Sequence, residues 1–360
     1  MNIGLIDADL LDKGTRHPNL ALMKLSGYYK ELGNDVELLM DYNNIENYDK
    51  VYISKVFNFT TTPNLDSYDN ISIGGTGFFS SGGEDLPCNI EHHMPDYTLY
   101  DSYVDSEVAN GVKPNKFKDY KDYSIGFATR GCFRKCEFCV NKKYDRVQIH
   151  SPIKEFLDVS KKGIYLWDDN FLAFPQWEEV LDELVATKKS FQFRQGLDIR
   201  LMTEKIAQKF AKVKYNGDFI FAFDHIKNRE QIERGLKIWK KYVTKTTKLY
   251  VLSAYDSQDL TDIENVFKRI EILMDYKCLP YIMRYEEYHN SEFKDMYIQI
   301  ARWCNQPSFF KKKSFREFCI ANQDYHKNKN TNCKCYQTML NFQEKYPIVA
   351  NRYFDIKFEK

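Results

Sequence analysis

The chain has 360 residues, of which 43% are hydrophobic and 29% charged, a composition typical of a globular protein with a sizeable core. Its 52 basic and 51 acidic residues leave a net charge of +1, which excludes a strong overall attraction to nucleic acids or membranes. No apolar run reaches the roughly 18 residues of a transmembrane helix, and the first residues have the pattern of a strand rather than a signal peptide. We therefore expect a cytoplasmic protein.

The first 105 residues alternate between strand and helix patterns. The patterns predict one amphipathic helix at residues 20–32 and strands at residues 2–6, 36–40, 50–56 and 70–74. Strands separated by helix-length segments predict an open, Rossmann-like parallel sheet for residues 1–105. Residues 106–122 are polar and lack periodicity, which predicts a linker.

The alternation resumes at residue 123. Strands are predicted at 124–129, 163–167, 190–195, 218–222, 248–254 and 278–283, and helices at 176–187, 203–213, 228–242 and 259–276. Six β/α units predict a partial (β/α)6 TIM-like barrel over residues 123–290. Residues 291–360 are predicted to be a C-terminal extension that contains cysteines. The predicted fold class is therefore α/β.

The strongest motif is C-x3-C-x2-C, formed by Cys132, Cys136 and Cys139 directly after a predicted strand. A [4Fe–4S] cluster needs four ligands, and thiolates are the usual choice. Three cysteines on one loop can hold three irons and leave the fourth open to the amino and carboxylate groups of S-adenosylmethionine. The alternatives are a zinc site or buried free thiols, but zinc usually takes four protein ligands in pairs, and no second pair is close in sequence.

This loop at the end of a first barrel strand, followed by further β/α units, resembles the radical S-adenosylmethionine superfamily over roughly residues 120–290. The resemblance implies an enzyme whose [4Fe–4S] cluster reductively cleaves S-adenosylmethionine to a 5′-deoxyadenosyl radical, which abstracts hydrogen from a substrate. The substrate is unidentified and could be a small molecule or a macromolecule. The electron donor would be a protein such as flavodoxin or ferredoxin. In this family an aromatic residue at the position of Phe138 packs near the adenine.

Other cofactor-binding candidates follow the second and third barrel strands, because polar residues at the carboxyl ends of barrel strands face the active site. By resemblance, Asp168 and Asp169 would bind the ammonium of the substrate or of methionine. A helix N-cap with an acidic first turn is the alternative for this pair. Gln195, Asp198 and Arg200 would contact ribose, the methionine carboxylate or the substrate. An exposed loop with a local Asp–Arg pair is the alternative for these three residues.

Two further candidates follow the fourth and fifth strands. Asp224 stands where relatives carry residues that meet the methionine moiety, and Ser253 could bind ribose. His225, beside Asp224, is either an acid–base group or a packing residue. The sequence assigns no catalytic residue.

The N-terminal segment resembles the cobalamin-binding domain that is fused to many radical S-adenosylmethionine enzymes. The resemblance rests on the strand order, on residues 17–20 before the first helix and on Gly74 and Gly75 after the fourth strand. No D-x-H-x-x-G sequence is present, so cobalamin would bind without a histidine on cobalt. Two interpretations stay open: a Rossmann-like domain without cobalamin, or a cobalamin-dependent methyltransferase.

The C-terminal extension holds Cys304, Cys319, Cys333 and Cys335. Four thiolates could hold an auxiliary iron–sulfur cluster or a zinc ion, and reduced thiols are the alternative. Basic and aromatic residues are mixed at 309–316, as in some single-strand nucleic-acid sites and in many solvated edges. A zinc-stabilised nucleic-acid-binding protein without catalysis is therefore the competing class.

Overall fold

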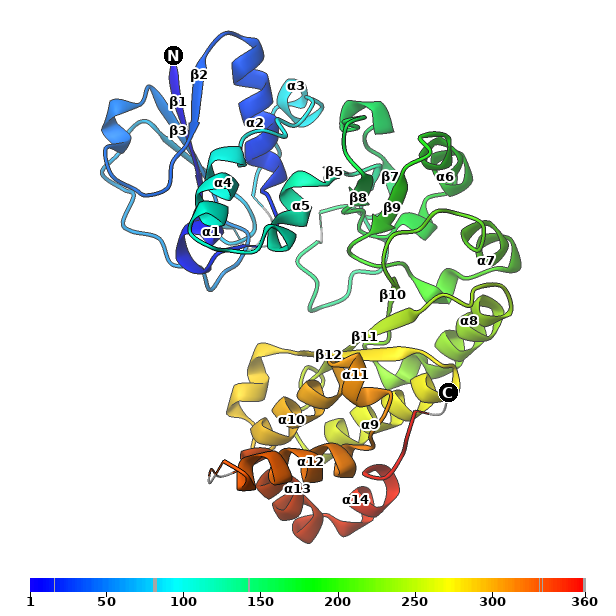
Figure 1. Ribbon diagram of the computed structural model, residues 1–360. Helices are drawn as coiled ribbons and strands as arrows, with labels where there is room; N and C mark the ends of the chain where they lie inside the picture. Colours follow the sequence, from blue (N-terminus) through cyan, green and yellow to red (C-terminus); the bar gives the residue numbers. More distant parts are fainter. Residues whose placement is uncertain (16, 80–82, 142, 330, 332, 359–360) are drawn as a thin grey trace. The chain divides into compact units, whose positions relative to one another are not determined.

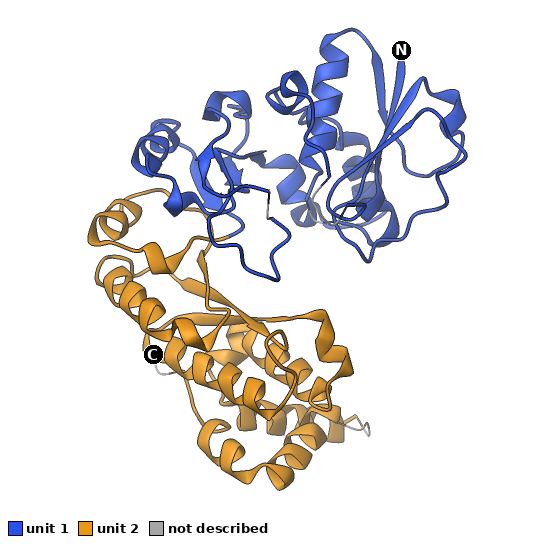
Figure 2. Cartoon of the chain, turned by 180° about the vertical axis from the view of Figure 1, so that it is seen from behind, with its two compact units in different colours: residues 1–195 blue, residues 196–360 orange. Residues whose placement is uncertain are grey.

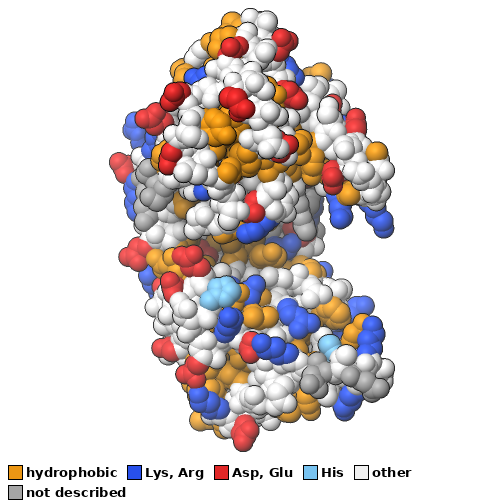
Figure 3. All heavy atoms as spheres, turned by 90° about the vertical axis from the view of Figure 1, so that its left-hand side faces the viewer, with side chains coloured by type: hydrophobic (Ala, Val, Ile, Leu, Met, Phe, Trp, Pro, Cys, Tyr) orange, Lys and Arg blue, Asp and Glu red, His pale blue; other side chains and the backbone are white. Residues whose placement is uncertain are grey.

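The computed structural model describes residues 1–15, 17–79, 83–141, 143–329, 331 and 333–358. The chain divides into two compact units, Met1–Gln195 and Gly196–Lys360 (Figure 2). No helix among the described residues is both long and apolar enough to cross a membrane. On the face drawn in Figure 3, acidic and basic side chains are both spread among uncharged ones.

Unit 1 begins with the predicted parallel sheet, whose strand order is β2-β1-β3-β4 (Figure 1). Its strands are β1 (Asn2–Asp7), β2 (Asp35–Leu38), β3 (Lys50–Ser54) and β4 (Ile71–Gly74). The helices after β1 are α1 (Ala8–Lys13) and α2 (Leu20–Glu31). Residues 3–7 of β1 are all buried, as expected for a central parallel strand covered on both faces. The four predicted strands and the predicted helix are confirmed.

The segment between the two sheets of unit 1 is helical. It contains α3 (Cys88–Glu91), α4 (Asp101–Ala109), η2 (Pro114–Phe117) and α5 (Lys118–Lys121). Phe117 and Tyr120 are buried in the same core as Ile3 and Leu5 of β1 and Leu22 of α2. Residues 106–122 were expected to be a linker, but these two aromatic side chains fold the segment onto the sheet.

The second sheet of unit 1 is parallel, in the order β5-β8-β9, with β5 (Tyr123–Gly126), β8 (Gly163–Leu166) and β9 (Ser190–Phe193). Between β5 and β8 lie the antiparallel pair β6 (Thr129–Arg130) and β7 (Gln148–Ile149) and the turn η3 (Ile153–Glu155). The turn η4 (Phe171–Ala173) and helix α6 (Trp177–Ala186) connect β8 to β9. The motif cysteines follow β6.

Unit 2 contains three more parallel strands in the order β10-β11-β12. They are β10 (Phe219–Ala222), β11 (Thr247–Ser253) and β12 (Leu279–Arg284). The intervening helices are η5 (Ile199–Leu201), α7 (Glu204–Phe210), η6 (Ile226–Asn228), α8 (Arg229–Tyr242) and α9 (Leu260–Asp275). The six predicted strands therefore form, three in each unit, and the α/β fold class is confirmed. The predicted boundaries at residues 105, 122 and 290 remain predictions.

Among its described residues, the C-terminal extension contains helices and no strand. It comprises η7 (Glu286–Asn290), α10 (Lys294–Cys304), α11 (Pro307–Phe310), α12 (Phe315–Lys327), α13 (Lys334–Lys345) and α14 (Pro347–Tyr353). A capping box begins α12: the Ser314 side chain accepts from the Glu317 backbone N–H, and the Glu317 carboxylate accepts from the Ser314 N–H. Phe315 and Trp303, both fully buried, pack edge to face at a centroid distance of 5.7 Å.

Candidate active site

The cysteine loop begins at a position that only glycine fits. Gly131 has a φ of +102°, and a Cβ there would lie 2.3 Å from the Arg146 carbonyl oxygen. Cys132 directly follows this turn. The Cys139 N–H donates to the Cys136 carbonyl over 3.0 Å, which closes a tight turn between the other two cysteines. All three cysteines are partly exposed.

Three consecutive side chains after β8 hold the start of this loop. The buried carboxylate of Asp168 accepts hydrogen bonds from the Ala128 N–H at 3.1 Å and from the Thr129 N–H and Oγ1 at 2.6 and 2.7 Å. Asp169 accepts from the Gly131 N–H at 2.7 Å. The side chains thus follow the backbone of residues 128–131 in order, and they fix where the cysteine loop leaves the sheet.

The third side chain of this series reaches a motif cysteine. Asn170 Nδ2 donates to the Sγ atom of Cys132 over 3.3 Å, and the Arg134 N–H lies 3.5 Å from the same sulfur. Burial raises the pKa of Asp168 to about 7, although its hydrogen bonds to Thr129 act in the opposite direction. The predicted ammonium contacts of Asp168 and Asp169 remain predictions, but the observed bonds favour a positioning role for Asp168.

Two buried polar atoms beside the loop have no hydrogen-bond partner among the described residues. They are the Oδ1 acceptor of Asn170 and the Nε donor of Arg130, which lies in an ion pair 3.7 Å from Asp169 Oδ2. Buried polar atoms are nearly always hydrogen-bonded, so such a pair indicates a missing polar ligand. The amino and carboxylate groups of S-adenosylmethionine offer a matching donor and acceptor. These two atoms are therefore compatible with the cofactor that the sequence predicts, and the cluster ligands remain a prediction.

Within the described ranges, no three His, Cys, Asp or Glu side chains converge on a point where one metal ion could bind. Cluster ligands differ from ligands of a single ion, because each thiolate binds a separate iron of the cube. Phe138 lies in the same loop and is partly buried. Its proximity to adenine stays a prediction.

The three candidate cofactor-binding residues after β9 are divided between the two units. Gln195 is exposed and is the last residue of unit 1. In unit 2, Asp198 caps η5 by accepting from the Arg200 N–H, and it pairs with Arg200 Nε at 2.7 Å and Nη2 at 3.1 Å. The structure therefore contains the local Asp–Arg pair that the sequence offered as the alternative. The predicted cofactor contacts of these three residues are untested.

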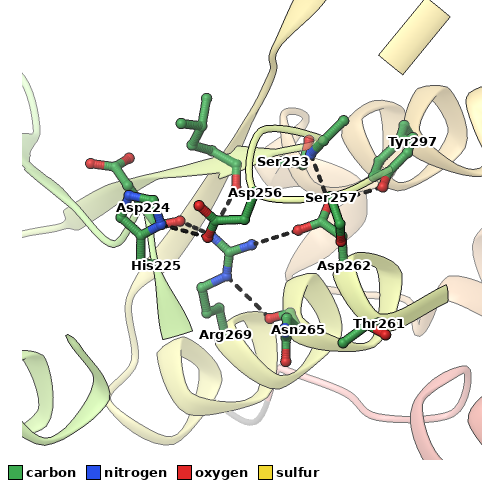
Figure 4. Close-up of polar contacts among 12 residues, drawn as sticks. Asp224, His225, Ser253, Asp256, Ser257, Thr261, Asp262, Asn265, Arg269 and Tyr297 are labelled. Atoms are coloured by element: carbon green, nitrogen blue, oxygen red, sulfur yellow. Dashed lines mark hydrogen bonds and ion pairs between the residues drawn. The ribbon is translucent and has the colours of Figure 1, made fainter. Parts of the chain in front are cut away.

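The carboxyl ends of β10 and β11 are joined by an arginine that the sequence reasoning missed. Arg269 of α9 is 2% exposed, and its Nη1 donates to the carbonyls of Phe223, Asp224 and Leu252 at 3.1, 2.6 and 2.7 Å (Figure 4). The signal was present in α9, since Asp262 and Arg269 are seven residues apart among apolar residues of one helix face.

Of the predicted residues of unit 2, Asp224, His225 and Ser253 lie around Arg269 (Figure 4). Burial raises the pKa of the Asp224 carboxyl, against the attraction of Arg269. Ser253 is fully buried and its Oγ donates to the Met283 carbonyl of β12 at 3.2 Å. His225 Nδ1 lies 2.6 Å from Asp256 Oδ2. The sequence therefore predicted which strand ends carry polar residues, but it did not predict the hydrogen bonds that these residues make.

Ala254 marks a strained turn at the end of β11. Its φ is +60°, a left-handed conformation that is uncommon for a residue with a Cβ. Two side chains clamp it: Asp262 accepts from the Ala254 N–H at 2.7 Å, and Gln258 donates to the Ala254 carbonyl at 3.1 Å. Strain held in this way is frequent at functional sites.

Comparison with known proteins bears on the fold. No protein-family model matches the sequence, and no curated protein matches it. A solved structure does match: the radical S-adenosylmethionine methyltransferase TsrM from Kitasatospora setae, with cobalamin and a [4Fe–4S] cluster bound. The TM-score is 0.50 at 12% sequence identity, over 79% of this chain and 72% of TsrM. Over this length the chain shares the fold of TsrM.

The fold shared with TsrM, a radical S-adenosylmethionine methyltransferase, confirms at the level of fold the resemblance predicted from the cysteine loop and the β/α units. The match over 79% of the chain is longer than the predicted barrel alone, in keeping with the predicted likeness of the N-terminal domain to cobalamin-binding domains. At 12% identity the likeness concerns the fold. Cobalamin and the cluster are ligands of TsrM.

The four cysteines of the extension are buried. Among the described residues, no three of them lie close enough together to hold one metal ion. Cys319 of α12 and Cys335 of α13 have their Sγ atoms 3.3 Å apart, and this contact lowers the pKa of Cys335 and raises that of Cys319. Burial raises the pKa of Cys304. A second metal site at these residues stays a hypothesis.

Proposed function

We propose that this protein is a radical S-adenosylmethionine enzyme. The observation that carries the proposal is the side-chain series Asp168, Asp169 and Asn170, which attaches a three-cysteine loop to the carboxyl end of β8 in a chain with the radical S-adenosylmethionine fold. When bound, a [4Fe–4S] cluster supplies the electron that breaks the sulfonium C–S bond of S-adenosylmethionine, which yields methionine and a 5′-deoxyadenosyl radical.

The chain's own residues would bind and orient these groups. Cys132, Cys136 and Cys139 would hold three irons, and Asn170 would donate to the Cys132 thiolate as it now does to the thiol. Arg130 Nε and Asn170 Oδ1 would receive the cofactor's carboxylate and amino groups. A reduced flavodoxin or ferredoxin would supply the electron, and the cytoplasm would keep the thiols reduced.

The test is anaerobic reconstitution with iron and sulfide, followed by dithionite and S-adenosylmethionine. We expect 5′-deoxyadenosine from the wild-type protein and neither cluster nor product from Cys136→Ala. The matched control is Cys88→Ala, since Cys88 is an exposed cysteine outside the loop. A fully loaded cluster without 5′-deoxyadenosine contradicts the proposal. Bound zinc without cleavage would favour the zinc-stabilised class instead.

Cobalamin-dependent methyl transfer is the second candidate, because unit 1 exposes aromatic side chains just beyond β3 and β4. Phe57 is 47%, Phe59 60% and Phe79 38% exposed, and the rings of Phe57 and Phe59 stack at 5.1 Å. Asp9 fixes this segment by accepting from the Val56 N–H at 2.7 Å. Ligands of open parallel sheets bind at the carboxyl ends of the strands, and a flat apolar corrin ring suits such a surface.

Gel filtration after incubation with hydroxocobalamin tests this candidate. We expect the corrin absorption to elute with the wild-type protein and to be lost in a Phe57→Ala, Phe59→Ala double variant. Substituting Phe309, an exposed ring of α11 in unit 2, provides the control. Elution of all cobalamin with the small molecules rejects the candidate and leaves a Rossmann-like domain without cobalamin.

A further inference from the structure

One face of the β5-β8-β9 sheet carries a polar cluster to which no role has been assigned. Strand pairing continues one residue beyond β8 and β9, since the Trp167 N–H donates to the Gly126 carbonyl at 3.0 Å and the Arg194 N–H to the Leu166 carbonyl at 2.8 Å. Side chains two residues apart on a strand share a face. Trp167 therefore lies on the same face as Tyr165, and the Arg194 guanidinium stacks on the Tyr165 ring at 4.5 Å.

Two residues from the N-terminal part of unit 1 cover this face. His17 precedes α2, and its Nε2 lies 3.2 Å from Arg194 Nη2. Asp119 of α5 lies 3.4 Å from the same Nη2. The His17 ring meets the Trp167 indole edge to face at 5.3 Å. We call His17, Asp119, Tyr165, Trp167 and Arg194 the Arg194 cluster.

The Arg194 cluster contains polar atoms that lack good partners. Trp167 Nε1 is buried, and no acceptor for it exists within the described part of the chain. Elsewhere the protein satisfies its buried indoles: Trp239 donates to Thr247 Oγ1 and Trp303 to the Lys313 carbonyl, both at 2.9 Å. A buried donor without an acceptor is costly, so the exception at Trp167 indicates a ligand.

The other contacts in the cluster are a close His17–Asp119 ion pair and longer bonds from Arg194, whose Nη1 also donates to Gln192 Oε1 at 3.2 Å. His17 Nδ1 lies 2.5 Å from Asp119 Oδ2 but outside hydrogen-bond geometry, and it has no other partner among the described residues. The 3.4 Å separation between Arg194 and Asp119 exceeds the usual length of such a bond. Arg194 can therefore exchange this contact for a better acceptor.

We infer that Arg194 and Trp167 bind a carboxylate. A guanidinium offers parallel N–H donors that match the two oxygens of a carboxylate, and the indole N–H supplies one more donor beside it. Asp119 competes for Arg194, because a carboxylate arriving there meets a like charge. Which molecule brings the carboxylate rests on the proposed function: it belongs to the substrate or, in place of the Arg130 contact proposed above, to the methionine end of S-adenosylmethionine.

The test follows the indole N–H resonances of the full-length protein by 15N–1H NMR during titration with sodium acetate, with sodium chloride at equal ionic strength as the reference. Trp167→Phe assigns the Trp167 resonance. We expect that resonance to move saturably with acetate, while the Trp303 resonance stays still. Arg194→Gln should weaken acetate binding about tenfold. Asp119→Asn should tighten it about fivefold, because it removes the competing charge.

A second arm repeats the titration at saturating S-adenosylmethionine. Acetate that still binds assigns the site to a substrate, whereas acetate that is excluded assigns it to the cofactor's own carboxylate. The inference is overturned if the Trp167 resonance does not shift with acetate or shifts equally with chloride. It is also overturned if Arg194→Gln binds acetate as tightly as the wild type. Acetate binding needs neither cluster nor reductant, so its failure is distinct from failure to form 5′-deoxyadenosine.

Discussion

Asn170 Nδ2 donates a hydrogen bond to Cys132 Sγ across 3.3 Å and so connects the end of β8 to the first motif cysteine. The bond lies at the end of a series in which Asp168 holds residues 128 and 129 and Asp169 holds residue 131. The strand that follows the loop in sequence therefore determines the path of the loop.

Replacing Asn170 with alanine should make the reconstituted cluster harder to reduce. A hydrogen bond to a thiolate stabilises the more negative, reduced state, so its loss should lower the midpoint potential by roughly 40 mV, equivalent to about 1 kcal/mol for one electron. Redox titration followed by electron paramagnetic resonance measures the shift. Asn341→Ala, at an exposed position of α13, is the control. An unchanged potential in Asn170→Ala would show that the bond is absent from the loaded protein.

Replacing Asp168 with alanine should destabilise unit 1. The variant leaves the buried N–H groups of Ala128 and Thr129 without an acceptor, which should lower the free energy of unfolding by about 3 kcal/mol. Urea unfolding measures the change. Asp145→Ala is the matched control, because Asp145 is an exposed carboxylate near the same loop whose one ion pair within the described ranges is with Lys135. Equal stabilities of the two variants would contradict the positioning role of Asp168.

Asp7 should make stability depend on pH. Its carboxyl is 2% exposed and accepts from the Leu10 N–H and Tyr100 OH, and burial raises its pKa from 3.8 to about 6. Between these values the folded protein holds a proton that the unfolded chain has lost. Asp7 therefore contributes stability that is complete below about pH 4 and lost as the pH rises through 6.

Asp7→Asn provides the comparison, since asparagine keeps the helix N-cap and does not titrate. The free energy of unfolding of the wild type, minus that of Asp7→Asn, should fall by about 3 kcal/mol between pH 4 and pH 7. Chemical denaturation at several pH values measures it. A difference that stays constant or rises with pH is the contrary result.

Arg269→Met should unfold unit 2 more easily. The substitution leaves the carbonyls of Phe223, Asp224 and Leu252 without this donor and Asp262 without its cation, for an expected loss of about 3–5 kcal/mol. Arg229→Met is the control, because Arg229 forms only an exposed pair with Glu233 on α8 and should cost about 0.5 kcal/mol or less. Thermal and urea unfolding compare the two. Equal losses of stability in the two variants would show that the contacts of Arg269 do not stabilise unit 2.

The amino-acid sequence alone determined the strands, the α/β class and the cysteine loop. Alternation of strand and helix patterns is local, so β1, β8 and β11 could be placed without knowledge of their neighbours. Cys132, Cys136 and Cys139, the cysteines that predict an iron–sulfur cluster, lie within eight residues of the chain. These features are encoded by residues close together in the chain, and they led to the radical S-adenosylmethionine resemblance that the fold confirms.

Only the tertiary structure decided what the polar side chains contact. Asp168 and Thr129 are 39 residues apart, and Arg194 and His17 are 177 apart, so no local pattern relates the members of either pair. Residues 106–122 appeared to be a linker because their two core aromatics, Phe117 and Tyr120, share a core with Ile3 and Leu5 of β1, which lie far earlier in the chain. Burial and hydrogen bonding depend on which strands become neighbours, and that follows from packing of the whole chain.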